Sequence, residues 1–269
     1  MKSKSHLTNY NKTIDCIKAN LSMAAEGFEA RAMSLIELVQ GDPSACARSL
    51  SHYAQARAML AWIEQDDLLA TRQQFYLASK LMQLSHQIDI SQNISNLTIS
   101  PGPKNFELLN TLVSNNREQI DWFTRCDAIY DMKYVEKINS VDFLMYQSIV
   151  ALRGEWSRLI DRCEKVIANP PASLKKWHDY HYFYLALAQG DKAKMEEVLA
   201  TMVAQNKLRT RVSEEYPFTE NLIFSRVIIG MKIAWLHGFE VHVDSPYVPM
   251  EWMPMTPLDN YDNYYSFLK

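Results

Sequence analysis

The side chains with the clearest capacity for chemistry lie in the run His178-Asp179-Tyr180-His181. Two histidines three residues apart on a helix share one face, so they could bind a metal ion if carboxylates from elsewhere joined them. The sequence has no HExxH motif and no second histidine pair to complete such a site. We therefore predict a structural or surface role for His178 and His181, and no metal.

Other catalytic signatures are absent from the sequence. It contains no GxSxG nucleophile motif and no glycine-rich phosphate loop of the GxGxxG or GxxxxGK type. The carboxylate pairs Asp66-Asp67, Glu196-Glu197 and Glu214-Glu215 are adjacent in sequence, and neighbouring helical residues point about 100° apart. Such pairs are typical of solvated helix faces. We predict that the protein is not an enzyme and has no cofactor.

The C-terminal segment, residues 238–269, combines prolines, aromatic rings and acids. Pro246, Pro249, Pro254 and Pro257 recur too often for a helix. The segment is nevertheless too rich in Tyr, Trp, Met and Phe to stay solvated. We therefore predict an extended tail that lies against an apolar surface of its own domain or of a partner.

The polar and aromatic tips of this tail are the candidate partner-binding residues. Aromatic rings interleaved with acids are typical of protein interfaces, and the acids would suit a basic partner. The candidates are Asp244, Tyr247, Glu251, Trp252, Asp259 and Tyr261. The alternative is that the tail caps the last helix and seals the core. We favour this alternative, since Met250, Met253, Met255 and Leu258 must be buried in any case.

Helical spacing dominates the first half of the chain. One region extends from about residue 7 to 40 with a kink or break at Gly27, and Gly41-Asp42-Pro43 has the residue order of a helix–helix junction. Two further helices are expected to end near residues 63 and 88. Residues 89–105 are polar and rich in turn residues, so they predict a long loop or sub-domain seam. Shorter helices are expected near 105–113, 115–124 and 130–137.

The second half is more regular. Gly154 and Gly190, 36 residues apart, each join an apolar helix to a shorter amphipathic one, which predicts tetratricopeptide-like hairpins over 140–206. Pro217 is expected to open the last helix, which includes the apolar stretch 222–236. The alternating segment 239–244 could form a strand only with a partner, so we expect it to hug the helices. The predicted fold is all-α: a single domain, 1–269, built as an irregular helical-repeat stack that carries the tail 238–269.

Bulk composition excludes several classes of protein. The chain has 269 residues, of which 48% are hydrophobic and 22% charged, and its net charge is -3. This balance shows no basic footprint for nucleic acid. The N-terminus lacks the apolar core of a signal peptide, and 222–236 is too short and too charged to span a bilayer. Four widely spaced cysteines are expected to stay reduced. We predict a cytoplasmic protein that binds neither nucleic acid nor membrane.

The end of the chain also resembles a known family. A helix and Gly238 precede the alternating Val241-His242-Val243-Asp244; the turn at Pro246 follows, and Pro257-Leu258-Asp259-Asn260-Tyr261 closes the pattern. This order is similar to the end of the bacterial immunity protein 49 family. Ser245 separates Asp244 from Pro246, where a direct Asp-Pro is commoner in that family. The resemblance is clearest over about residues 225 to 269.

The resemblance implies an antitoxin of bacterial competition. Such a protein is made with a polymorphic toxin, often one delivered by contact-dependent or type VI secretion. It binds the toxin domain in the cytoplasm and keeps it inactive. The family has no catalytic residues to carry over to this chain. The partner implied is the cognate toxin domain, and oligomeric state is left open.

Two other functions are compatible with the residues. One is a helical-repeat adaptor or scaffold that holds a peptide or protein in the groove of the 140–206 hairpins, which requires an open concave face. The other is a helical enzyme or metal protein centred on His178 and His181, which requires bound metal.

Overall fold

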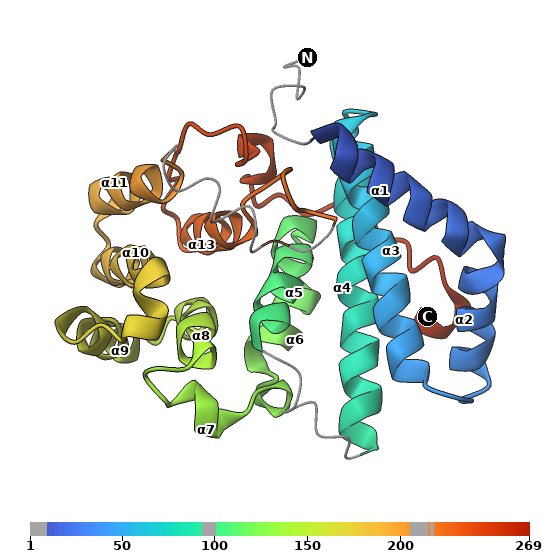
Figure 1. The fold of residues 1–269 in the computed structure, drawn as a ribbon, viewed down its shortest axis with the longest axis horizontal. Helices are drawn as coiled ribbons and strands as arrows, with labels where there is room; N and C mark the ends of the chain where they lie inside the picture. The colour runs from blue at the N-terminus through green and yellow to red at the C-terminus, as the bar shows by residue number, and fades with distance from the viewer. Residues whose placement is uncertain (1–9, 93–100, 205–214, 216–217) are drawn as a thin grey trace.

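The computed structural model describes residues 10–92, 101–204, 215 and 218–269, and all regular secondary structure among these residues is helical, with no β-strand. The all-α prediction is therefore confirmed. Figure 1 shows a long helical hairpin on the right and a stack of shorter helices on the left. Residues 93–100 of the predicted loop 89–105 lie outside the described residues, as do 205–214, 216 and 217.

The long hairpin consists of α3 (Pro43–Ile63) and α4 (Leu68–Ser91). Both helices start with an aspartate whose carboxylate accepts a main-chain N–H at 2.9 Å: Asp42 from Ala45, and Asp67 from Ala70. These N-caps satisfy amides that the first helical turn leaves without a partner. Pro43 occupies the first turn of α3, as the sequence predicts.

An outer layer covers the hairpin. It contains α1 (Tyr10–Met23), a single π turn (Ala24–Phe28) and α2 (Glu29–Glu37). Gly27 has φ 121°, a conformation that a side chain would disfavour, and it sets the break between α1 and α2 that the sequence predicts. Both helices pack on α3.

Short helices connect the hairpin to the stack. They are α5 (Pro101–Ser114), α6 (Arg117–Arg125), a 3₁₀ turn (Asp127–Ile129) and α7 (Met132–Val135). The predicted helices at 105–113 and 115–124 are confirmed, whereas only Met132–Val135 of the predicted 130–137 forms an α-helix. Of these, α5 packs along α4 and also contacts α8, so it joins the two halves of the molecule.

The stack consists of α8 (Val141–Leu152), α9 (Trp156–Ala168), α10 (His178–Gln189) and α11 (Lys192–Met202), and successive helices contact one another. Gly154 and Gly190 have φ of 66° and 70°, so they end α8 and α10 in the left-handed conformation. The entry into α10 is irregular. Residues Ala172–Trp177, just after Pro170-Pro171, form a 3₁₀ turn, and the α-helix begins only at His178.

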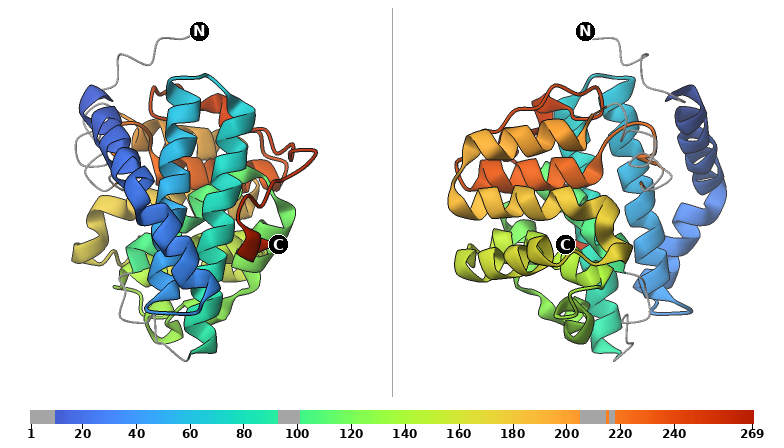
Figure 2. Two further views of the ribbon diagram at one scale, coloured as in Figure 1. Left: turned by 90° about the vertical axis from the view of Figure 1, so that its right-hand side faces the viewer. Right: turned by 60° about the vertical axis from the view of Figure 1, so that its left-hand side comes forward.

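The last helix, α13 (Ser225–Leu236), lies between the stack and the hairpin, beside α5, α8 and α10. It begins later than predicted. Pro217 lies outside the described residues, and the turn at Thr219–Leu222 precedes the helix. Glu215 accepts the N–H of Ser225 at 2.8 Å and so caps the actual start. In the right-hand view of Figure 2 the helices of the stack are seen from the side, along their lengths.

The tail leaves α13 and crosses to the far side of the hairpin, and the C-terminus lies beside α2 (Figure 1). Apart from the 3₁₀ turns Met250–Trp252 and Ser266–Leu268, it has no regular structure, and residues 239–243 form no strand.

Two apolar clusters fill the interior. The larger one includes residues from the hairpin, the stack, α13 and the first part of the tail. The smaller one lies among α2, α3 and α4 and is completed by Tyr265 and Leu268 from the end of the tail. Within the described ranges, no helix has the length and apolar character needed to cross a membrane.

Candidate partner-binding surface

The tail is held by side chains that bind its carbonyl oxygens. Lys232 of α13, which is fully buried, donates to the carbonyls of Trp252 (2.9 Å) and Met253 (3.3 Å) and to Asn115 Oδ1 (2.5 Å). Asn115 in turn donates to the carbonyls of Pro254 and Thr256, both at 2.9 Å. Proline-rich chain without regular structure leaves its carbonyls unpaired, so buried donors must satisfy them.

A second buried basic side chain lies beside Lys232 and Asn115. Arg72 of α4 donates to the carbonyls of Pro254 and Thr256, both at 3.3 Å. Burial lowers the pKa of Lys232 to about 6, and the positive charge of Arg72 acts in the same direction. The residues from 252 to 256 are thus fixed from two helices, α4 and α13, and from the turn after α5.

Two of the six predicted partner-binding residues are core residues. Trp252 is fully buried, with its ring edge-on to Trp62 (centroids 4.9 Å apart) and Phe75 (5.2 Å). Tyr247 is buried and stacks on Phe224 at 4.9 Å. Their rings therefore lie in the interior, and any contribution to partner binding would be to hold the tail in place.

The three acids among the candidates are exposed: Asp244, Glu251 and Asp259. Glu251 accepts from the indole of Trp62 at 2.8 Å, which fixes its position at the surface. Tyr261 is half-buried; its hydroxyl donates to the carbonyl of Ser114 at 2.8 Å. The six residues do not form one cluster. They are distributed along the length of the tail, with acids outward and rings inward.

The end of the tail is anchored on α2 and α3. Tyr265, which is buried, donates its hydroxyl to Glu29 Oε1 at 2.6 Å, and Glu29 forms an ion pair with Arg57. Burial raises the pKa of Tyr265 above its usual value, so the hydroxyl remains a donor at neutral pH.

Tyr265→Phe is expected to lower the free energy of unfolding by about 1–2 kcal/mol, because it leaves the half-buried Glu29 without one donor. Urea unfolding followed by circular dichroism measures this loss. Tyr264→Phe is the matched control, since Tyr264 is 66% exposed and should tolerate the change. Equal stability of Tyr265→Phe and the parent would show that this bond contributes nothing.

His178 and His181 share one side of α10, with ring centroids 6.4 Å apart. His181 is buried near Phe143, and neither of its ring nitrogens has a hydrogen-bond partner in the described structure. The described residues contain no group of three or more His, Cys, Asp or Glu side chains that could hold a metal ion. His181 is thus a core residue.

The burial of His181 should make the protein sensitive to acid. Burial lowers its pKa to about 3, and the charges of His178 and Arg162 add to the effect. Between that value and the usual 6.5, the unfolded chain binds the proton and the folded chain does not. Stability should therefore fall as pH drops below about 6.5.

We expect His181→Phe to reduce the loss of stability between about pH 7 and pH 5, measured by urea unfolding at both values. Burial also lowers the pKa of His52 and of His237, so these two residues should retain part of the dependence of stability on pH. His242→Asn, at an exposed position, should behave like the parent. If the stability of His181→Phe fell between about pH 7 and pH 5 as much as that of the parent, the burial of His181 would not be a cause of the acid sensitivity.

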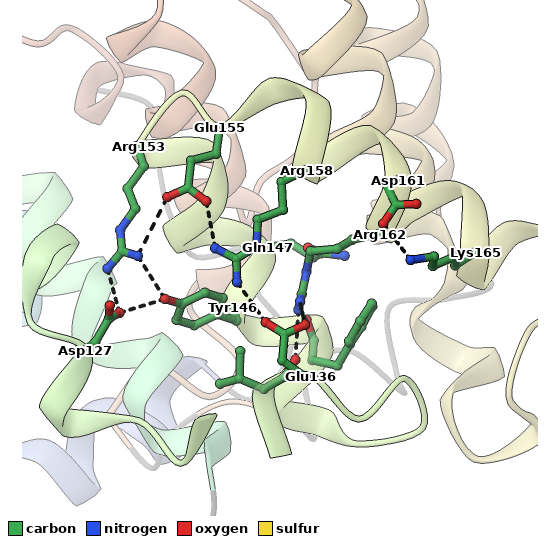
Figure 3. A network of polar contacts seen from close by, with 12 residues as sticks. Asp127, Glu136, Tyr146, Gln147, Arg153, Glu155, Arg158, Asp161, Arg162 and Lys165 are labelled. Carbon is green, nitrogen blue, oxygen red and sulfur yellow. Dashed lines mark hydrogen bonds and ion pairs between the residues drawn. The ribbon is translucent and has the colours of Figure 1, made fainter. Parts of the chain in front are cut away.

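A polar network joins α9 to the segment before it (Figure 3). Arg162, which is buried, donates to Gln147 Oε1 (2.9 Å), to Glu136 Oε2 (3.0 Å) and to the carbonyls of Val135 and Phe143 (both 3.0 Å). Its guanidinium also lies 3.8 Å from the centroid of the Phe143 ring.

The network continues toward the surface. Arg158 bridges Glu155 and Glu136, both at 2.7 Å, and Arg153 binds Asp127 at 2.6 Å. The arginines and carboxylates alternate and pair with one another (Figure 3). The arrangement fixes α7, α8 and α9 against each other, and its outer members Asp127, Arg153 and Glu155 line a shallow surface pocket.

Lys232 holds the tail and Arg162 holds the network of α7, α8 and α9, and neither role was predicted from the sequence. A lysine within the apolar stretch 222–236 is a signal of a buried cation, although the sequence does not show what it binds. For Arg162, the strongly amphipathic helix offers no comparable signal, because its other arginine and lysine residues are surface groups.

Comparison with known proteins gives one match. No curated protein and no solved structure matches the chain. The model of the family described as immunity protein 49 matches residues 155–252. These residues comprise α9, α10, α11, α13 and the tail as far as Trp252, so the match extends further upstream than the predicted resemblance and ends before Pro257–Tyr261. The resemblance is thus confirmed: residues 155–252 of this chain match immunity protein 49.

Proposed function

We propose that this protein is an immunity protein that binds a cognate bacterial toxin domain in the cytoplasm and keeps it inactive. The match of residues 155–252 to immunity protein 49 carries this proposal. The toxin is one used in competition between bacteria, delivered by contact or by type VI secretion. The immunity protein acts by stoichiometric binding and performs no reaction of its own.

The charge of the tail supports a basic partner. From residue 238 to 268 the chain contains no Lys or Arg, and its acids Glu240, Asp244, Glu251, Asp259 and Asp262 are all exposed. Acids placed along one element attract a basic protein surface and steer its approach. Many toxin domains that cleave nucleic acid need a basic cleft, so a toxin of this class fits the tail.

The test is protection of cells. The proposal predicts a toxin gene next to the gene for this chain, and the toxin domain that it encodes is expressed with and without this protein while growth is compared. We expect growth only with co-expression, and a one-to-one complex with an inactivated toxin domain in size-exclusion chromatography. Equal killing in both cultures would overturn the proposal. A variant that loses the tail anchor, Tyr265→Ala, tests whether protection depends on the folded protein.

The adaptor hypothesis has less support from the structure. It requires an open concave face on the hairpins, and α13 packs against α8 and α10 on one side of that stack. The nine described residues from Ser225 to Ala234 other than Arg226 are all buried, so α13 fills the space instead of lining a groove.

A further inference from the structure

The segment Phe239–Asp244, called here the edge segment, alternates apolar and polar residues and forms no regular secondary structure. Its side chains alternate as in a strand, with Val241 and Val243 buried and Glu240, His242 and Asp244 exposed. Yet the described part of the chain supplies no neighbouring strand. The pattern of a half-buried strand is present, and its pairing partner is not.

The edge segment is fixed in position without being paired. His242 donates its main-chain N–H to Glu196 Oε1 of α11 at 3.0 Å, and Val241 accepts from the indole of Trp235 at 3.1 Å. Among the described residues, no hydrogen bond involves the main-chain N–H or C=O of Val243 or Asp244. An extended segment of a partner binds best to a segment whose main-chain groups are free and already held in position. The entropic cost of ordering the edge segment is then not added to the cost of binding.

A shallow groove runs beside these main-chain groups, between the end of α11 and the edge segment. Ala200, Val203 and Ala204 form one wall, and residues 242–246 form the other. The small apolar side chains of α11 let another chain approach closely. The groove can therefore take apolar side chains from a segment that pairs with Asp244, whose main-chain groups share an edge with the His242 N–H that points to α11.

The rim of the groove is acidic. Asp244 lies in its wall, and Glu240 is exposed on the same side of the alternating segment; neither forms an ion pair with a described residue. Lys192 of α11 is 3.8 Å from Glu196 and so is already paired. Among the described residues of the rim the net charge is negative, which favours a segment that carries Lys or Arg beside its apolar residues.

We infer that the edge segment and the α11 groove are where the toxin docks, by adding an extended segment that combines basic and apolar residues alongside Val243 and Asp244. This inference rests on the proposed function and narrows it to one surface. Main-chain hydrogen bonds supply affinity, the groove takes apolar side chains, and Asp244 and Glu240 select for positive charge. Both the edge segment and α11 lie within residues 155–252, the part that matches the family.

Hydrogen exchange on the full chain tests the pairing directly. The probe is the purified, inactivated toxin domain encoded beside the gene. Peptides that cover residues 239–246 should exchange more slowly in the complex than in the free protein, while peptides that cover 259–264, also in the tail and similarly acidic, should not change. Equal exchange of 239–246 in both states would overturn the inference.

Two pairs of matched variants test the groove and its charge. Ala200→Arg fills the groove, and Ala193→Arg makes the same change at an exposed position earlier on α11. Asp244→Lys reverses charge at the rim, and Glu26→Lys makes the same change at an exposed position in the outer layer, away from the tail. We expect the dissociation constant to rise about tenfold or more for Ala200→Arg and Asp244→Lys, and by about twofold or less for the controls.

The outcomes separate this inference from the proposed function. Protection and binding by the parent, with Ala200→Arg and Asp244→Lys as effective as their controls, would leave the immunity function standing and overturn the docking site. Absence of binding by the folded parent protein would overturn both. Circular dichroism of each variant confirms that a lost complex is not a lost fold.

Discussion

Trp252→Ala is expected to lower the free energy of unfolding by about 3–5 kcal/mol. Trp252 is fully buried, and its ring packs edge-on against Trp62 and Phe75, which lie on the two helices of the long hairpin. Removing the indole leaves a large cavity and ends two aromatic contacts. It also loosens the residues whose carbonyls Lys232 binds. Denaturant unfolding monitored by circular dichroism gives the loss directly.

The control is Tyr264→Ala, which removes an aromatic ring from the same tail at a position that is 66% exposed. It should change stability by less than about 0.5 kcal/mol. Trp252→Phe keeps part of the ring packing and should fall between the two. A Trp252→Ala protein as stable as the parent but unable to bind the toxin would reverse the conclusion and make this ring an interface anchor.

Arg162→Lys should cost about 3–5 kcal/mol, although it keeps the charge. The planar guanidinium reaches four oxygens from different parts of the chain, and its face lies against the Phe143 ring. An ammonium has no planar fork and cannot reproduce these directions. The buried Gln147 and the two carbonyls would then lack donors. Thermal and urea unfolding of the variant measure the effect.

Lys165→Ala is the matched control on the same helix (Figure 3). Lys165 pairs with Asp161 at 2.7 Å, but both side chains are more than half exposed, so the pair should contribute little. We expect a change below about 0.5 kcal/mol. If Arg162→Lys and Lys165→Ala had equal effects, the buried network would not be the feature that holds α7, α8 and α9 together.

Local signals made much of the fold predictable. Gly27, Gly41-Asp42-Pro43, Gly154 and Gly190 act through their own backbone, so their positions alone indicate where helices break or end. The start of the last helix was not predictable in this way. Pro217 suits a first helical turn, but the helix begins at Ser225, where Glu215 from outside the helix caps it. A cap supplied from a distance leaves no mark in the local sequence.

The candidate site was predictable only in part, for the same reason. The prolines and rings of the tail predict a segment that must lie on an apolar surface, and the structure shows that course. Which rings point inward depends on residues far away: Trp62 and Phe75 for Trp252, and Phe224 for Tyr247. Composition treats Trp252 and Asp244 alike as tail residues. Only the tertiary contacts make one a core residue and the other a surface acid.

The anchoring of Tyr265 and Leu268 among α2, α3 and α4 has a consequence for biosynthesis. The ribosome makes these helices early. Tyr265 and Leu268, which complete their apolar cluster, are made long after α4 has ended at Ser91. The N-terminal helices must therefore wait through the synthesis of the rest of the chain with that surface open, exposed to chaperones and to misassembly. A product truncated before Tyr265 would lack the two side chains that complete this cluster.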